Sequence, residues 1–538
     1  MSLVKHGKRY YKQMSLEVAT RNPERFEGFL KTYSKFDGHR LDDAGILDIY
    51  TQLFLDGVVT SEDFDTDEVS EKFIRKYIVE TRTHNNEWGF PTGYQAAFNR
   101  YLKTLSEFGF IYSQYNEPLR ISPVGKAVVS GTISLSEAFA LQSMRFWRKS
   151  PYRRVLNDFN FFRFILTVIQ RLNEQGKKLS YPQFMLALFS DDGDVDAFID
   201  LISKNKIGSD FESAYRLAVE KYNMVDAEHG KVNKIASSFN AYGDTVFRVL
   251  QLTGFITIDY QGVMLLSINS LRSHLLRDLM AFDFSVPETA QEDEDEYFQL
   301  LGSLNSTLLN LIIKYRDEQS YSVGEYNLKL KNIVDTYDLN KDSLAAYLNE
   351  VSDGKKDKNA FRFIQAPLKF EFLLSLYLYA CYGDEFEYKP NYLCDESGIP
   401  YSHAPGNIGD IEVFNSQQYW LIEATLIKGK TQQVNSETIN LFRHIDQSKR
   451  GAKYLSLVAP YIHDDTDLLI KVATIVTMSE SNSLVFAKPY ATRDFVEITN
   501  ECNSLTNMQD YTISFIHKLN LKMQSIESCY SIVSGGAE

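Results

Sequence analysis

The chain has 538 residues and is acidic overall, with 57 Lys and Arg against 71 Asp and Glu and a formal net charge of −14. Its hydrophobic fraction of 44% and charged fraction of 24% exclude a mostly disordered chain. No apolar run approaches the ~20 residues of a transmembrane helix, and the basic, polar N-terminus precedes no apolar segment of a secretory signal. We therefore expect a cytoplasmic protein of roughly three or four domains that has no membrane partner.

The charge is unevenly placed along the chain. Residues 1–40 hold nine basic residues against four acidic ones, and residues 145–154 interleave Arg and Lys with aromatic side chains. The opposite extreme is the acidic block, five consecutive carboxylates at residues 292–296. An acidic total normally counts against nucleic acid as a partner, but the two basic stretches favour DNA locally. The candidate DNA-contact residues are Lys35, Arg40, Arg145, Arg148, Lys149, Arg153 and Arg154.

Two stretches of the N-terminal half share one order of predicted elements. In the first, a helix over 94–108 ends at Gly109, a short hairpin spans 110–121, and Ser122 caps a further helix. In the second, a helix ends at Gly254, and strands over 255–260 and 263–268 flank a turn at residues 261–262. This order is typical of a winged helix. Winged helices bind DNA or other proteins, and two copies in one chain favour DNA.

The remaining segments complete the predicted organisation. Residues 161–172 show the apolar spacing of a buried helix, and residues 297–331 form a helical connector. We expect a multidomain α+β protein with two winged-helix-like modules in a mostly helical N-terminal half and an α/β C-terminal domain. The predicted boundaries are 1–150 and 151–285 for the two modules, 286–345 for an acidic, helical linker, and 346–538 for the last domain.

A predicted hairpin near residue 416 places two carboxylates together. Residues 410–414 and 418–425 have strand composition, and a two-residue turn at Ser416-Gln417 puts Asp410 directly opposite Glu423. Opposed Cβ atoms lie ~4.5–5.5 Å apart, so both carboxylates can reach one divalent cation, whose oxygen ligands lie at ~2.0–2.1 Å for Mg²⁺. The hairpin therefore predicts a metal site.

Two further carboxylates are candidates for the same site. Ser436 is predicted to cap a helix whose first turn holds Glu437. Glu371 lies in an apolar helical run, where a buried carboxylate needs a partner or a cation. Cations held by carboxylates activate water and stabilise charge on a phosphoryl group.

The spacing Asp, twelve residues, Glu-x-Thr resembles the PD-(D/E)xK nuclease motif. The longer segment, residues 403–445, resembles the AlwI-type restriction endonucleases, a family of type IIS enzymes and strand-specific nickases. The resemblance covers most of the chain and is densest at 361–460. It is carried by His403-Ala404, Gly406-Asn407, Asp410, Glu423-Ala424-Thr425, Lys428-Gly429, Thr431-Gln432, Glu437 and Arg443-His444, together with residues 21–25, 35–38 and 454–460.

The resemblance implies roles for the acidic residues. Asp410 and Glu423 are the expected Mg²⁺ ligands, with the carbonyl of Ala424 as a third, and Glu437 and Glu371 match supporting acidic positions of the family.

One position departs from the wider superfamily. Thr425 stands where a Lys is usual, which puts in doubt a charge-stabilising Lys at that position. His403, a lone histidine in a loop, is a candidate to line the site, but we favour a role in loop packing and do not assign it as the base.

The resemblance implies a restriction-modification enzyme that hydrolyses double-stranded DNA with Mg²⁺ at a fixed distance outside an asymmetric site. One active site per chain cuts one strand, so double-strand cleavage needs a second subunit or a transient homodimer. Two alternatives stay open: a DNA-binding regulator with an inactive nuclease-like domain, and a structure-specific defence nuclease that grips single strands by stacking.

Overall fold

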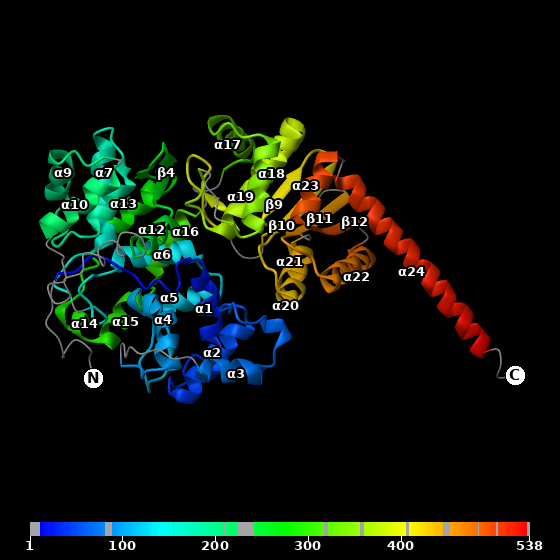
Figure 1. The fold of residues 1–538 in the computed structure, drawn as a ribbon, viewed down its shortest axis with the longest axis horizontal. Helices are drawn as coiled ribbons and strands as arrows, with labels where there is room; N and C mark the ends of the chain where they lie inside the picture. Colours follow the sequence, from blue (N-terminus) through cyan, green and yellow to red (C-terminus); the bar gives the residue numbers. More distant parts are fainter. Residues whose placement is uncertain are drawn as a thin grey trace. The chain divides into compact units, whose positions relative to one another are not determined.

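The structure is a computed structural model that describes residues 11–80, 89–153, 155–208, 210–222, 242–316, 321–355, 360–404, 408–444, 452–481, 484–501 and 504–534. It contains two compact units (Figure 1). Unit 1 comprises Met1–Ser320 and Cys394–Ser402, and unit 2 comprises Tyr321–Leu393 and His403–Glu538. Unit 1 thus ends inside the segment predicted as a linker. None of the described helices is both long and apolar enough to cross a membrane.

The first part of unit 1 is helical with one small hairpin. Gly109 has a positive φ of 70°, and the Ser122 hydroxyl accepts a hydrogen bond from Gly125 N at 3.1 Å, as the pattern predicts. The strands are only two residues long because the loop that joins them bonds instead to residues 38–41, including Gly38 N to Leu119 O at 2.7 Å. The elements are α1 (Arg25–Ser34), α2 (Asp43–Leu55), α3 (Glu71–Glu80), α4 (Tyr94–Glu107), β1 (Ile111–Tyr112), β2 (Arg120–Ile121), α5 (Pro123–Val129) and α6 (Leu135–Arg145).

The second part of unit 1 contains a three-stranded antiparallel sheet in the order β3-β5-β4. The predicted hairpin is present, with positive φ values of 68° at Gly254 and 77° at Gly262. The elements confirm the predicted helix–hairpin–helix order, whereas its interpretation as a winged helix stays a prediction. They are α7 (Phe161–Glu174), β3 (Leu179–Ser180), α8 (Tyr181–Ala187), α9 (Val195–Lys204), α10 (Phe211–Tyr222), α12 (Gly243–Leu252), β4 (Ile256–Tyr260), β5 (Met264–Ile268) and α13 (Ser273–Ala281).

The acidic block lies within unit 1, where it forms the start of a helix. After α14 (Glu288–Glu292), the Asp293 carboxylate caps α15 (Glu294–Gly302), which α16 (Ser306–Lys314) follows. Glu294 is buried and accepts a hydrogen bond from Gln114 at 2.6 Å, and burial raises its pKa to about 7. Asp295 forms an ion pair with Arg120. Part of the block is therefore held in contacts and is not a freely solvated run.

Unit 2 is built on a five-stranded mixed sheet in the order β12-β11-β10-β9-β6. β10, β11 and β12 are parallel, and β9 and β6 are antiparallel to their neighbours. The strands are β6 (Glu387–Pro390), β9 (Ile411–Phe414), β10 (Gln418–Ala424), β11 (Ala452–Ala459) and β12 (Val485–Ala491). The helices are α17 (Val323–Thr336), α18 (Lys341–Ser352), α19 (Ala366–Tyr382), α20 (Lys430–Gln432), α21 (Thr438–Arg443), α22 (Asp464–Ser481), α23 (Thr492–Glu501) and α24 (Ser504–Ser534).

Helices cover both faces of this sheet, since alternate side chains of β10 are buried on opposite sides. Leu421 packs in a cluster with Leu441 of α21 and Ile470 of α22. Trp420 points the other way, where its ring lies 5.9 Å from that of Phe495 in α23. The predicted α/β character of the C-terminal domain is therefore observed.

Between β6 and β9, the chain leaves unit 2 and returns to it. Leu393–Cys394 (β7) pairs with Pro400–Ser402 (β8), and residues 394–402 belong to unit 1. There the Thr257 hydroxyl donates a hydrogen bond to the buried Asp395 carboxylate, and the guanidinium of Arg272 donates one to the Tyr401 hydroxyl at 3.4 Å. No sequence pattern predicts this excursion, because it depends on which surface these nine residues find in unit 1.

Candidate active site

The β9–β10 hairpin brings Asp410 and Glu423 together in the predicted register. Ile411 pairs with Ile422 and Phe414 pairs with Tyr419, so Asp410, the residue before β9, lies opposite Glu423. The turn is held by Asn415, whose side-chain oxygen accepts hydrogen bonds from the backbone of residues 417 and 418. Asp410 Oδ2 in turn accepts a hydrogen bond from Ala424 N at 2.8 Å. One side chain of the pair is therefore bound to the backbone of the strand that carries the other.

Glu437 reaches the site from a helix that starts earlier than predicted. The helical turns begin at Lys430 after the N-cap residue Gly429, and Gln433–Glu437 forms a π-helical turn before α21. Ser436 is therefore inside the helix, and its predicted role as the N-cap is wrong. The physical reason is that Gln433 N already bonds to Gly429 O at 3.1 Å, so the helical hydrogen bonds start upstream. π-turns are frequent at functional sites.

Glu371 lies on α19 and is 3% exposed. Its Oε1 atom is 2.5 Å from Nδ1 of His403, the residue that follows β8. His403 therefore contacts one of the candidate carboxylates, which differs from the favoured role in loop packing. A lone histidine in a loop carries no periodic signal, so its contact with α19 depends on the fold.

Burial and neighbouring carboxylates make Asp410, Glu423 and Glu437 harder to ionise. Burial and the neighbouring Glu371 and Glu423 raise the pKa of Asp410 well above its usual range. Burial and Glu437 raise the pKa of Glu423 to about 8, while burial and Glu371 raise the pKa of Glu437 to about 7. Glu371 and Glu423 are buried and Asp410 and Glu437 are half-buried, and like charges raise one another's pKa values only at short range. We call this set the acidic cluster.

A second histidine, His444, contacts the cluster from the end of α21. Its Nδ1 atom is 2.6 Å from Oε1 of Glu423, and both side chains are buried. Burial and Arg443 lower the pKa of His444, whereas the pKa of Glu423 is raised. Both shifts favour the neutral forms, so the contact is a hydrogen bond rather than an ion pair. His444 lies seven residues after Glu437 on the same helical segment, so both residues fall on one side of the helix. This spacing was the sequence signal that could have identified His444.

The chemistry of the acidic cluster suits a divalent cation. Carboxylate oxygens are the ligands that Mg²⁺ prefers, and a cation relieves the repulsion that raises these pKa values. Over the described ranges, no group of three or more His, Cys, Asp or Glu side chains is arranged as a metal-binding cluster. Asp410 and Glu423 each have an oxygen engaged in a hydrogen bond, to Ala424 N and to His444 respectively. The side chains are thus not arranged as a ligand set in this structure, and it is their donor type and charge that fit Mg²⁺.

Thr425 directly follows β10. Its hydroxyl accepts a hydrogen bond from Ile427 N at 3.2 Å, and its own N–H donates to Val458 O at 3.0 Å. Lys430 forms an ion pair with Asp465 at 2.5 Å, while Lys428 is exposed. Thr425 therefore contributes to the end of the sheet.

The basic block at 145–154 is largely buried, which differs from the expected contact with DNA phosphates. Arg145 donates to Leu301 O at 2.7 Å and Ser303 O at 2.6 Å. Arg148 is 2% exposed and donates to Ser190 O at 2.7 Å. Backbone carbonyls thus solvate both guanidinium groups, and the expectation that these two residues bind DNA is corrected.

The other candidate DNA-contact residues are more exposed than Arg145 and Arg148. Arg153 is bound to Glu107 at 2.7 Å and is mostly buried, and Lys149 lies 3.7 Å from Asp158. Lys35 is exposed and pairs with Asp56 at 2.7 Å, and Arg40 is exposed. Arg154 lies outside the described residues. Lys35 and Arg40 therefore stay the better placed candidates.

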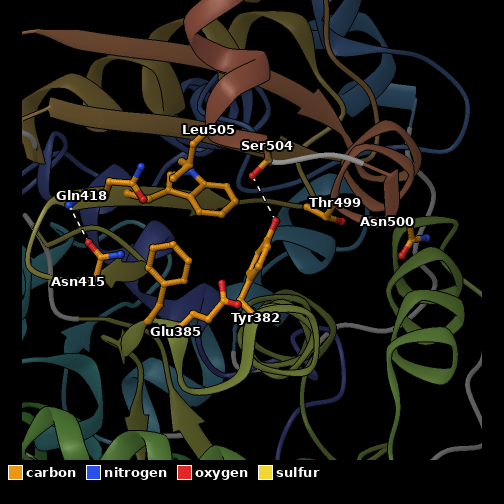
Figure 2. A pocket seen from close by; sticks show the side chains of 10 residues that line it. Tyr382, Glu385, Asn415, Gln418, Thr499, Asn500, Ser504 and Leu505 are labelled. Carbon is orange, nitrogen blue, oxygen red and sulfur yellow. Dashed lines mark hydrogen bonds between the residues drawn. The ribbon is translucent and has the colours of Figure 1, made fainter.

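A separate pocket of about 440 Å³ lies at the other end of the β9–β10 hairpin (Figure 2). Asn415 and Gln418 of the turn line it together with Tyr382, whose hydroxyl lies 3.4 Å from that of Ser504. The acidic cluster is at the opposite end of the same strands, so this pocket is not the candidate active site.

Comparison with known proteins places the chain in a family. The model of the AlwI restriction endonuclease family matches residues 106–353 and 342–498. Among solved structures, the chain is similar to the small subunit (R.BspD6I2) of the heterodimeric restriction endonuclease R.BspD6I, with 18% identity, a TM-score of 0.24, and coverage of 32% of this chain and 87% of that chain. The search of curated proteins found no match. The chain belongs to the AlwI restriction endonuclease family, whose members are nucleases that act on DNA.

Proposed function

We propose that the protein is a Mg²⁺-dependent, sequence-specific DNA endonuclease of type IIS. The family supports a nuclease acting on DNA, and the acidic cluster carries the proposal for this chain. Asp410, Glu423 and Glu437, whose pKa values are raised by burial and by like charge, are costly in a purely structural role, because each must stay protonated or find a counter-charge. A divalent cation supplies that counter-charge.

The chain's own residues divide the work at this site. Asp410, Glu423 and the carbonyl of Ala424 would hold the cation, and Glu437 and Glu371 would add negative charge around it. When bound, Mg²⁺ neutralises charge on the reacting phosphate and makes water more acidic.

The two histidines contact carboxylates, and we assign them positioning roles. The hydrogen bond of 2.6 Å from His444 fixes the orientation of Glu423, and the contact of 2.5 Å from His403 fixes that of Glu371. Such contacts to ligand side chains set ligand geometry. Neither histidine needs to carry a charge for this role.

Type IIS cleavage is proposed from the separation of the chain into two units. Unit 2 holds the acidic cluster, and unit 1 holds the two helix–hairpin–helix regions that resemble winged helices. In a winged helix, one helix reads bases in the major groove, while phosphate contacts set the register. Reading and cutting by different units suit cleavage at a set distance outside an asymmetric site.

The test is cleavage of a supercoiled plasmid with Mg²⁺, followed by mapping of the ends on both strands. We expect discrete fragments with a fixed offset from one short sequence, and none with EDTA. Asp410→Asn should lower the rate by at least about a hundred-fold, as the loss of a group that stabilises transition-state charge does.

Glu412→Gln is the matched control for that variant. Glu412 lies on β9 two residues after Asp410, but it bonds to Lys389 at 2.8 Å and to Asn391 at 3.1 Å, outside the acidic cluster. Its variant should cleave at the wild-type rate. Undiminished cleavage by Asp410→Asn would refute the site, and DNA binding without cleavage under any divalent ion would support a regulator.

A further inference from the structure

Gln433 is the first residue of the π-helical turn, and its side chain is 0% exposed. The side-chain amide nitrogen donates to the carbonyl oxygens of Ile427 at 2.9 Å and Tyr461 at 2.7 Å. The side-chain oxygen accepts from the backbone N–H of His463 at 3.4 Å and from the hydroxyl of Thr466 at 3.2 Å. A glutamine amide has two N–H donors and an oxygen with two lone pairs, so this side chain uses its whole hydrogen-bonding capacity.

The partners of Gln433 belong to the segments that leave two neighbouring strands. Ile427 follows β10, which carries Glu423, and Tyr461 follows β11. Because β10 and β11 are parallel, their carboxyl ends lie at the same edge of the sheet, which is the usual place for a ligand site in an α/β fold. Gln433 therefore connects the helical segment of residues 430–444 to the edge of the sheet that carries Glu423.

The backbone of Gln433 closes the π-turn that precedes α21. Its carbonyl oxygen accepts the backbone N–H of Thr438, five residues on, and also the Thr438 hydroxyl at 3.2 Å. A π-turn contains one residue more than an α-turn, so it rotates the side chains that follow by about 100° relative to an uninterrupted α-helix. Glu437 is the last residue of this turn, and His444 follows on the same helical segment. The direction of both side chains therefore depends on the π-turn.

The place of Glu437 in the acidic cluster depends on its backbone. Burial and Glu371 raise the pKa of its carboxyl group and His444 lowers it, and among the described residues no hydrogen bond to this carboxyl group contributes to the shift. The charge of Glu437 in turn acts on Glu423. A side chain that no hydrogen bond orients is placed by the helical turn that carries it, and Gln433 anchors that turn.

We propose that Gln433 is a positioning residue, which holds the π-turn against the sheet and thereby keeps Glu437 in the acidic cluster. The consequence for cleavage rests on the proposed function, because Glu437 adds negative charge around the cation only when its carboxylate lies near Asp410 and Glu423. Loss of a residue that orients the side chains of a metal site lowers metal affinity by about ten- to a hundred-fold. The loss of Gln433 therefore weakens the binding of Mg²⁺ and not the binding of DNA.

The first test is the crystal structure of the metal-free Gln433→Met chain. Methionine is close to glutamine in size but replaces none of the four side-chain hydrogen bonds. We expect residues 433–437 to relax into α-helical hydrogen bonding, which turns Glu437 away, while the β9–β10 hairpin keeps its register. A π-turn that stays in place, with Glu437 in its present position, overturns the proposal.

The second test measures how plasmid cleavage depends on the Mg²⁺ concentration. Gln433→Met should need about ten- to a hundred-fold more Mg²⁺ for half-maximal cleavage, while its affinity for DNA in EDTA stays the same. Glu437→Gln should show a similar shift, and the double variant should show no further shift, because both changes act through one carboxylate. Additive shifts, or weaker DNA binding with an unchanged Mg²⁺ dependence, overturn the proposal.

Gln142→Met is the matched control for the loss of a buried glutamine. Gln142 is also 0% exposed and donates to two backbone carbonyl groups, those of Phe108 and Leu301, but it lies in unit 1. Its variant should lose free energy of unfolding as Gln433→Met does, yet keep the wild-type Mg²⁺ dependence. An equal shift of the Mg²⁺ dependence in both variants would show that Gln433 only stabilises the fold, which overturns the proposal.

A milder pair of variants gives the same answer if Gln433→Met does not fold. Thr438→Val removes only the hydroxyl that donates to Gln433 O, whereas Thr438→Ser keeps a hydroxyl there. We expect a few-fold higher Mg²⁺ requirement for the valine variant and none for the serine variant, and equal behaviour of the two contradicts the proposal. A wild type that cleaves nothing with Mg²⁺ refutes the proposed function, while the metal-free crystal structures of the variants still decide the positioning.

Discussion

The basic block at 145–154 and the acidic cluster each gather charges of one sign, the first along the sequence and the second only in the folded chain. The structure separates them. Arg145 and Arg148 are surrounded by backbone carbonyls that replace their hydration. The carboxyl groups of Asp410, Glu423 and Glu437 instead have pKa values that burial and neighbouring carboxylates raise. Buried charge with a complete set of partners holds a fold together, whereas buried charge left in mutual repulsion indicates a site for a ligand.

The largest effect is expected for a variant of the acidic cluster, which should lose activity but gain stability. Glu423→Gln removes one of the repelling carboxylates, so we expect cleavage to fall by about a hundred- to a thousand-fold while the metal-free protein becomes more stable at pH 8. Plasmid cleavage and thermal unfolding in EDTA measure the two effects. A loss of both activity and stability would show that Glu423, like Arg148, is a buried charge that stabilises the fold.

The next effect concerns stability alone. Arg148→Met removes the donor to Ser190 O and Lys12 O in a buried place, and we expect the free energy of unfolding to fall by about 2–4 kcal/mol. Chemical denaturation measures it, with Lys204→Met on the exposed surface of α9 as the control. Wild-type stability combined with weakened DNA binding would restore the phosphate-contact role of Arg148.

A pH titration tests the repulsion directly. The pKa values of Glu423 and Glu437, about 8 and about 7 in the folded chain, lie above their ordinary value of 4.5. Between pH 4.5 and about 8 the folded chain binds more protons than the unfolded chain. The free energy of unfolding therefore decreases as the pH rises through this range.

We expect the unfolding temperature in EDTA to fall from pH 5.5 to pH 8.5, and Mg²⁺ to reduce the fall. The double variant Glu423→Gln with Glu437→Gln should show a flatter profile. A wild-type profile that rises over this range would contradict the raised pKa values.

The smallest expected effect concerns the exposed basic residues. Arg40→Gln removes one exposed charge from unit 1, so we expect a few-fold loss of DNA affinity. The slope of the logarithm of the binding constant against the logarithm of the salt concentration should become shallower by about one. Fluorescence anisotropy at several salt concentrations measures both, and thermal unfolding should not change. An unchanged affinity and slope would leave Lys35 as the remaining candidate.

Local chemistry made much of unit 2 and part of the site predictable. The β9–β10 register followed from two alternating segments and a two-residue turn, which explains why Asp410 opposite Glu423 was foreseen. The helix that carries Glu371 followed from its apolar run. Ser436 was misassigned because a good capping residue inside a longer helix looks the same in sequence as one at its start.

The sequence by itself determined which residues could meet across a turn or along one helix, since those relations depend on backbone geometry within a few residues. Only the tertiary structure decided which charges are buried and with whom. Arg148 acquired carbonyl partners from distant segments, and His444 and His403 reached carboxylates 21 and 32 positions away. Burial depends on the packing of all the elements together, and no local pattern of charge contains that information.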